Sequence, residues 1–101
     1  MVVWTVNAAR DLRHVHDFIA SDSRFYARKV VDEILRRTAV LESFPEIGRV
    51  VPEIGRQDIR ELILYSYRII YRVRGSGDVE VLALLHARRD FPADVFDSEQ
   101  E

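Results

Sequence analysis

The stretch YSYRIIYRVRG, Tyr65 to Gly75, constrains the fold of this 101-residue chain more than any other. Aromatic or aliphatic side chains stand at every odd-numbered position from 67 to 73, and Arg68, Ile70 and Arg72 stand between them. Successive side chains of a β-strand point to opposite faces, so this alternation predicts a strand with one apolar face. The other face then carries guanidinium groups, and their role has to be explained.

Two further strands are predicted next to this one. The segment RGSGD supplies glycines that suit a hairpin turn, and Tyr65 and Ser66 make the other connection short. The flanking segments are rich in β-branched and other apolar residues. We therefore expect an antiparallel meander of three strands, at Ile59–Leu64, Tyr67–Val73 and Val79–His86.

The N-terminal half predicts a strand followed by two helices. Residues Val2–Val6 are β-branched or aromatic, and Asn7 is placed to cap a helix over Ala8–Ala20. A second helical period runs over Arg24–Phe44, and Pro45 disfavours helix at the residue before it. The two helices are expected to form a hairpin, in which Trp4, Phe18 and Tyr26, with Tyr71 of the sheet, belong to the core.

The order of the elements predicts an α+β domain in which the helical hairpin covers one face of a small sheet. Residues 45–58 hold two prolines and two glycines and are expected to form a loop. We expect one domain over residues 1–90 and an acidic tail over residues 91–101, ordered in part. The open face of the sheet should then expose Ile70, Leu82 and Leu84 to a partner or to the folded-back tail.

Composition excludes several classes of protein. With 48% hydrophobic and 32% charged residues, the chain is typical of globular proteins and not of disordered ones. No apolar run approaches the roughly 18 residues of a membrane span, and the N-terminus lacks a signal-peptide pattern, so we expect a cytoplasmic protein. The absence of cysteine excludes disulfides and thiolate metal sites.

Charge is distributed unevenly along the chain. The net charge is −2, but the last twelve residues hold five acids, and the remainder has 15 basic against 12 acidic residues. The acidic tail is either a solvated end or a segment that tempers a basic surface.

Cationic side chains gather in the C-terminal half of the sequence. If the helices cover one face of the sheet, the guanidinium groups of the middle strand lie on the other, where they suit phosphate or carboxylate recognition. A histidine near neutral pKa adds a group that could move protons. The alternative is a set of arginines that are solvated or paired with Glu61 or Glu80 across strands. The predicted target-binding residues are Arg60, Arg68, Arg72, His86, Arg88 and Arg89.

No cofactor or metal site is predicted. The segment GSG lies in a hairpin turn, where it cannot form the phosphate-binding loop that joins a strand to a helix. His14 and His16 are two apart on a predicted helix and therefore point to different faces.

Four segments together resemble the RelE/ParE superfamily of toxins from type II toxin–antitoxin systems, of the plasmid-stabilisation type and closer to ParE than to RelE. They are AARDLRHVHDFI, LESFPEIGRVVPE, IRELILYSYRIIYRV and VEVLALLHARRD, over about residues 2 to 90. The resemblance implies a small sheet with a helical hairpin. It also implies that a cognate protein antitoxin neutralises the toxin. Any binding of the toxin to operator DNA would then be indirect, through the antitoxin.

The resemblance leaves the target open. RelE-like members cut mRNA on the ribosome, using lysines on the REL strand and a C-terminal tyrosine, and this chain has Ile59, Glu61 and Phe96 (or Asp94) near those positions. ParE-like members inhibit DNA gyrase without an RNase site, and the departures favour that activity. If the chain is a metal-independent mRNA endoribonuclease instead, its catalytic residues would be Arg68, His86 and Arg88. A third alternative is an inactive module that only binds a partner.

Overall fold

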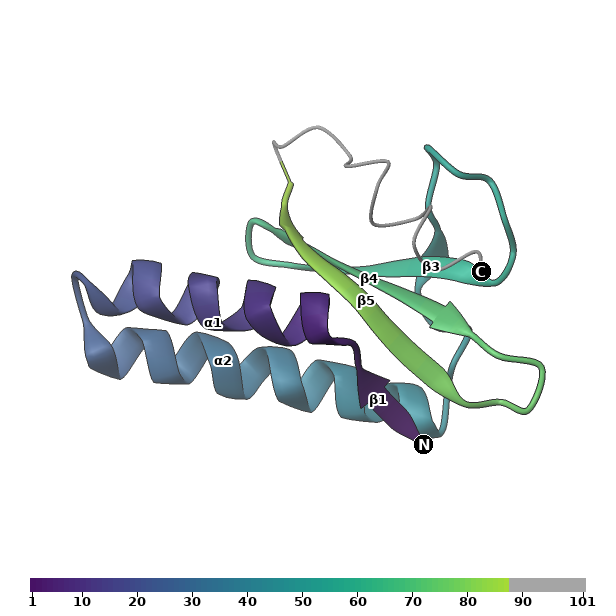
Figure 1. Ribbon diagram of the computed structural model, residues 1–101, viewed down its shortest axis with the longest axis horizontal. Helices are drawn as coiled ribbons and strands as arrows, with labels where there is room; N and C mark the ends of the chain where they lie inside the picture. The colour runs from purple at the N-terminus through teal and green to yellow at the C-terminus, as the bar shows by residue number, and fades with distance from the viewer. Residues whose placement is uncertain (88–101) are drawn as a thin grey trace.

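The computed structural model describes residues 1–87 and shows two helices on a mixed sheet (Figure 1). Arg88, Arg89 and residues 91–101 lie outside the described residues. In chain order the elements are β1 (Val2–Trp4), α1 (Val6–Ala20), α2 (Arg24–Ala39), the short 3₁₀ helix η1 (Val40–Glu42), β2 (Arg49–Val50), β3 (Ile59–Leu64), β4 (Tyr67–Val73) and β5 (Val79–His86).

The sheet has the strand order β1-β5-β4-β3-β2. Strands β3, β4 and β5 form the predicted antiparallel meander, and β1 joins its edge parallel to β5. The helical hairpin lies against one side of this sheet (Figure 1), which confirms the α+β prediction. The prediction of a loop over residues 45–58 is incomplete. Arg49 and Val50 form the short edge strand β2, in which they pair with Glu61 and Arg60.

Helix α1 begins earlier than predicted because Thr5, not Asn7, caps it. The Thr5 hydroxyl accepts a hydrogen bond from the Ala8 amide at 3.1 Å, and its backbone amide donates to the Val81 carbonyl at 3.0 Å. One residue thus ends the pairing of β1 and starts the helix. Ser23 caps α2 in the same way, with the Tyr26 amide at 3.1 Å. The second helix ends at Ala39, and η1 takes the chain on toward Pro45.

The main core lies between the helical hairpin and the sheet. Full burial of one aliphatic side chain in this core stabilises the folded state by about 1.5–3 kcal/mol. Two predicted core aromatics are absent from it, because Phe18 and Tyr26 are 77% and 52% exposed. They flank the turn of the hairpin, and this end extends beyond the sheet (Figure 1). Core residues include Ala8, Val30, Ile34, Leu41, Leu62, Ile69, Tyr71 and Val81, with Trp4 partly buried against them.

A β-bulge in β5 changes which side chains face the helices. Tyr71 pairs with Val81 and Ile70 pairs with Ala83, so Leu82 is an extra residue in β5. Alternation restarts after it, and Leu84 therefore packs in the same core as Val81.

Two side chains of the N-terminal half satisfy the backbone at this bulge. The Asp11 carboxylate of α1 accepts from the Leu84 amide at 3.1 Å, and the Thr5 hydroxyl donates to the Leu82 carbonyl at 3.3 Å. The bulge and the helix that covers it are therefore fixed to each other by hydrogen bonds as well as by packing.

A second apolar cluster occupies the opposite face of the sheet. The prediction of exposed side chains there is wrong: Ile70 and Leu82 are each 1% exposed, and Leu84 lies on the helix side and is 5% exposed. The reason is that part of the segment between β2 and β3 packs on this face. The cluster comprises Val51, Ile59, Ile70, Leu82, Ala83 and Leu85, with Ile54 packed against it.

We expect Asp11→Ala to destabilise the fold by about 1 kcal/mol, because the Leu84 amide loses its acceptor in a partly buried place. Chemical denaturation measures the effect, with Asp32→Ala on the exposed surface of α2 as the matched control for helix propensity. Equal midpoints for the two variants would show that the bulge does not need this carboxylate.

Candidate functional site

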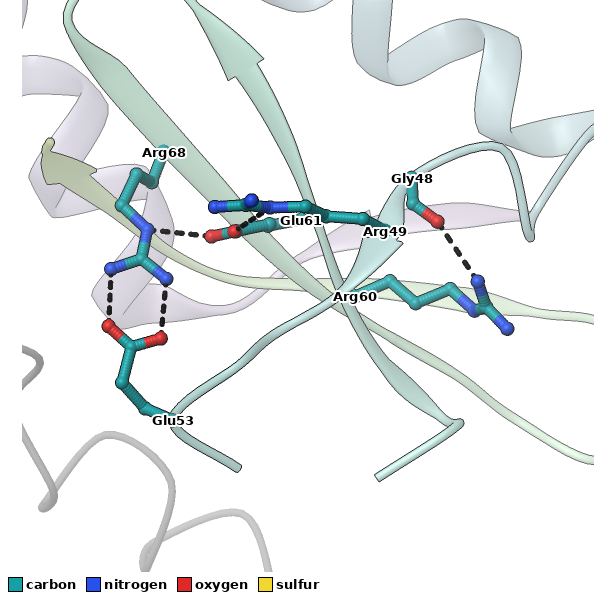
Figure 2. Close-up of polar contacts among 6 residues, drawn as sticks. All are labelled: Gly48, Arg49, Glu53, Arg60, Glu61 and Arg68. Atoms are coloured by element: carbon teal, nitrogen blue, oxygen red, sulfur yellow. Dashed lines mark hydrogen bonds and ion pairs between the residues drawn. The ribbon is translucent and has the colours of Figure 1, made fainter. Parts of the chain in front are cut away.

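Arg68, the central residue of the predicted cationic face, is buried between two carboxylates (Figure 2). Its Nε donates to Glu61 Oε1 at 2.6 Å, and its two terminal nitrogens donate to the Glu53 carboxylate at 2.7 and 2.8 Å. Its side chain is 8% exposed. The prediction that Arg68 projects from an open face is therefore wrong.

Glu61 joins Arg68 to a second arginine. Its side chain is fully buried, and Arg49 Nε donates to its Oε2 at 2.6 Å. Arg49 and Glu61 are directly opposite each other on β2 and β3, and Arg68 lies diagonally across on β4. We call Arg49, Glu53, Glu61 and Arg68 the Arg68 network. Two guanidinium groups meet two carboxylates in it, so the formal charges cancel.

Hydrogen bonding favours the ionised forms of Glu53 and Arg68. The Arg68 guanidinium lowers the pKa of Glu53 from 4.5 to about 2, because its two hydrogen bonds favour the ionised carboxylate. Hydrogen bonds to Glu53 and to Glu61 in turn raise the pKa of Arg68. Both Glu53 and Arg68 are therefore ionised throughout the neutral range, so this pair does not exchange protons there.

Gly48 brings β2 close enough for this network to form. Its amide donates to the Tyr71 hydroxyl at 2.9 Å, and burial raises the pKa of that hydroxyl. A Cβ atom at position 48 would stand 2.5 Å from the Glu61 carbonyl oxygen and 2.7 Å from Tyr71 Oη. Only glycine fits this approach. Arg60 fastens the same segment, since its guanidinium donates to the Gly48 carbonyl at 2.9 Å (Figure 2).

The remaining predicted residues do not share one face. Arg60 is opposite Tyr71 in the register and so lies toward the helix side. Arg72 lies on the face of Arg68, 3.6 Å from the Asp58 carboxylate. That carboxylate also binds Arg56 at 2.6 Å, and Arg56 is the main cause of the lowered pKa of Asp58.

His86 lies on the helix side as well, away from Arg68. It is opposite Tyr67, and the two rings are 5.7 Å apart in an edge-to-face arrangement. The bulge at Leu82 is the cause, since uninterrupted alternation from Val81 would have sent His86 to the other face. His86 lines a pocket of about 230 Å³ together with Asp11, His14, Val15, Phe18, Tyr67 and Leu84. Arg88 and Arg89 lie outside the described residues.

Within residues 1–87, no group of three or more His, Cys, Asp or Glu side chains is placed to hold a metal ion. No helix in the same range is long and apolar enough to cross a bilayer.

Three of the motifs that carry the family resemblance meet in this network. The segments GRVVPE, REL and YRIIYR contribute its four charged residues together with Gly48 and Tyr71. Sequence reasoning identified Glu61 as a partner for arginines across strands, which is confirmed. It missed Arg49 and Glu53, because residues in an apparent loop gave no signal of which strand they would face.

We expect Gly48→Ala to destabilise the protein by about 1–3 kcal/mol, since the added methyl group meets backbone and a buried hydroxyl. Gly75→Ala is the matched control, because a Cβ atom there meets nothing within 4 Å. Thermal unfolding compares the two variants. Similar melting temperatures would contradict the close approach of Gly48 to the Glu61 carbonyl and the Tyr71 hydroxyl.

Ionised Glu53 should stabilise the fold above pH 4.5, and its contribution should disappear as the pH falls from 4.5 toward 2. The sign follows because its pKa in the folded protein is lower than the ordinary value. Glu53→Gln should therefore be less stable than the parent at pH 7, and the difference should shrink in acid. Urea unfolding at several pH values measures it, and a difference that stays constant down to pH 2.5 would contradict the ion pair.

Comparison with known proteins agrees with this architecture. A family model described as the ParE toxin of the type II toxin–antitoxin system parDE matches residues 2–91. The Y4kP protein of Sinorhizobium fredii is 34% identical over 90 residues, which cover 88% of this chain and 90% of that protein. Toxin RelE2 of Caulobacter vibrioides is 28% identical over 88 residues, or 87% and 96% of the two chains.

Further matches are shorter or structural. Toxin ParE1 of Mycobacterium tuberculosis is 44% identical over 46 residues, 46% of each chain. A chain of the chromosomal ParDE system from P. aeruginosa has the same fold, with a TM-score of 0.71 at 23% identity, over 86% of this chain and 95% of that one. The family model and the full-length relative together show that this chain belongs to the ParE family of type II toxins, within the RelE/ParE superfamily.

Proposed function

We propose that this ParE-family toxin inhibits growth by binding DNA gyrase and that it does not cut RNA. The observation that supports this is the separation of Arg68 from His86. Arg68 is held by Glu53 and Glu61 on one face of the sheet, and His86 lies on the other. The family description names the parDE system, which favours the same choice.

Chemistry explains why this separation matters. Cleavage of RNA through its 2′-hydroxyl needs a base, a cation at the phosphorane and an acid within hydrogen-bond reach of one phosphate. Arg68 and His86 cannot reach one phosphate from opposite faces. The positions at which the resemblance places lysines hold Ile59 and Glu61, which are buried. A toxin that acts by binding needs no such convergence.

Contact with the target is assigned to side chains outside the Arg68 network. His86 is exposed beside Tyr67, and the sequence continues with Arg88 and Arg89. We propose these three as contacts. Arg60, Arg68 and Arg72 then act indirectly, by holding residues 48–58 in place.

The alternative is a ribosome-dependent endoribonuclease, which the similarity to RelE2 favours. In that case His86, which lines the pocket beside Tyr67, would act as a catalytic residue. A partner-binding module without toxicity is the third possibility.

Purified chain, assayed with and without its cognate antitoxin, should inhibit supercoiling by DNA gyrase, and the antitoxin should abolish the inhibition. The same preparation should leave transcript ends unchanged in a translation extract. His86→Ala should weaken inhibition by about tenfold, since an interface contact is lost, while Gly75→Ala should match the parent. Cleaved transcripts with unaffected gyrase would overturn the proposal, as would absence of both activities in folded protein.

A further inference from the structure

Residues 51–58, which we call the strap, join β2 to β3 and lie on the face of the sheet opposite the helices. We propose that the strap opens while the sheet stays folded, that the Glu53–Arg68 pair is its latch, and that a carboxylate of a protein partner replaces Glu53 in the guanidinium fork. This proposal does not depend on which target the toxin inhibits.

The backbone of the strap is fastened at its ends, and its middle bonds locally. The Val51 amide donates to the Ile59 carbonyl at 3.2 Å, and the Val73 amide donates to the Asp58 carbonyl at 2.8 Å. Between these anchors, the Ile54 and Gly55 amides both donate to the Val51 carbonyl, at 3.1 and 2.9 Å. The middle is therefore a small turn that can move as a unit while the ladder of β3 and β4 stays intact.

Side chains hold this turn on the sheet. Glu53 binds Arg68 through two hydrogen bonds, and Ile54 packs on the second apolar cluster. At the far end, Arg60 donates to the Gln57 carbonyl at 3.0 Å. Gly55 has a φ of +72°, and a Cβ atom there would meet nothing within 4 Å among the described residues, so there is open space beside this position of the turn.

The latch is asymmetric, and this decides which group leaves. The side chain of Arg68 is 8% exposed and is also bound by Glu61, whereas that of Glu53 is 42% exposed. Water can therefore compete for the hydrogen bonds of the Glu53 carboxylate more easily than for those of the Arg68 guanidinium. Departure of Glu53 would free the two terminal N–H donors that now bind it, while Glu61 keeps its hydrogen bond to Nε.

The geometry of the Arg68 fork identifies the chemistry of the replacement. The fork of Arg68 presents two parallel N–H donors, a geometry that matches a carboxylate, and it already binds one. Beside it, the apolar cluster under Ile54 can accept an aliphatic neighbour of the incoming acid. An Asp or Glu side chain of a protein partner is therefore the proposed occupant.

Hydrogen exchange tests the opening. In Glu53→Gln, the Ile54 and Gly55 amides should exchange about tenfold faster than in the parent, while amides of β3 and β4 change less than about twofold, because only local opening is promoted. The control is Glu46→Gln, which removes an exposed carboxylate 3.9 Å from Arg60 and should leave the strap unchanged. Unchanged strap amides, or acceleration of all amides together, would overturn the latch.

Titration with a decaglutamate peptide tests the replacement. The Arg68 Nε resonance should shift, and in Glu53→Gln the shift should need about tenfold less peptide, since the competing carboxylate is gone. A glycine–serine peptide of the same length should produce no shift. If decaglutamate leaves Arg68 unmoved in both proteins, the exchange of carboxylates is refuted. No gyrase is present in either assay, so either failure would leave the proposed function standing.

Discussion

The Arg68 guanidinium and its two carboxylates determine how the sheet is finished on the side away from the helices. Glu61 comes from β3, Arg68 from β4 and Glu53 from the strap, so one buried cation ties three segments together. Removing one partner from a buried ion pair leaves an uncompensated charge, which costs about 3–5 kcal/mol. The closed position of the strap and of the short strand β2 therefore depends largely on these ion pairs, together with the packing of Val51 and Ile54.

On the helix side, the β5 bulge has the corresponding role. An extra residue at Leu82 turns the end of the strand, so that Leu84 and His86 face the helical hairpin. Asp11 binds the Leu84 amide and Thr5 binds the Leu82 carbonyl, beyond the last pair of β1 with β5. The two faces of the sheet are thus specified by different means, one by ion pairs and one by a change of register.

Local patterns predicted most of this fold. Alternation of apolar and polar residues predicted β3, β4 and β5, and helical periodicity predicted the helical hairpin. Turn residues predicted the connections between the three strands. The sequence did not reveal the bulge, because Val81–Leu85 is apolar throughout and alternation is invisible there. That one residue moved His86 away from Arg68 and divided the predicted site. Glu53 was missed for a related reason, since its partner is fifteen positions away and depends on how the strap folds.

These findings separate family membership from choice of target. Several residues by which the chain resembles its superfamily belong to the Arg68 network and the Gly48–Tyr71 contact. In this chain they hold β2 and the strap on the sheet, and a shared fold does not by itself specify a target. We therefore expect choice of target to depend on exposed side chains outside the network, such as Phe18 beside the hairpin turn and His86 at the end of β5. A substitution of Arg68 that removes toxicity therefore identifies a structural residue, unless the variant is shown to be folded.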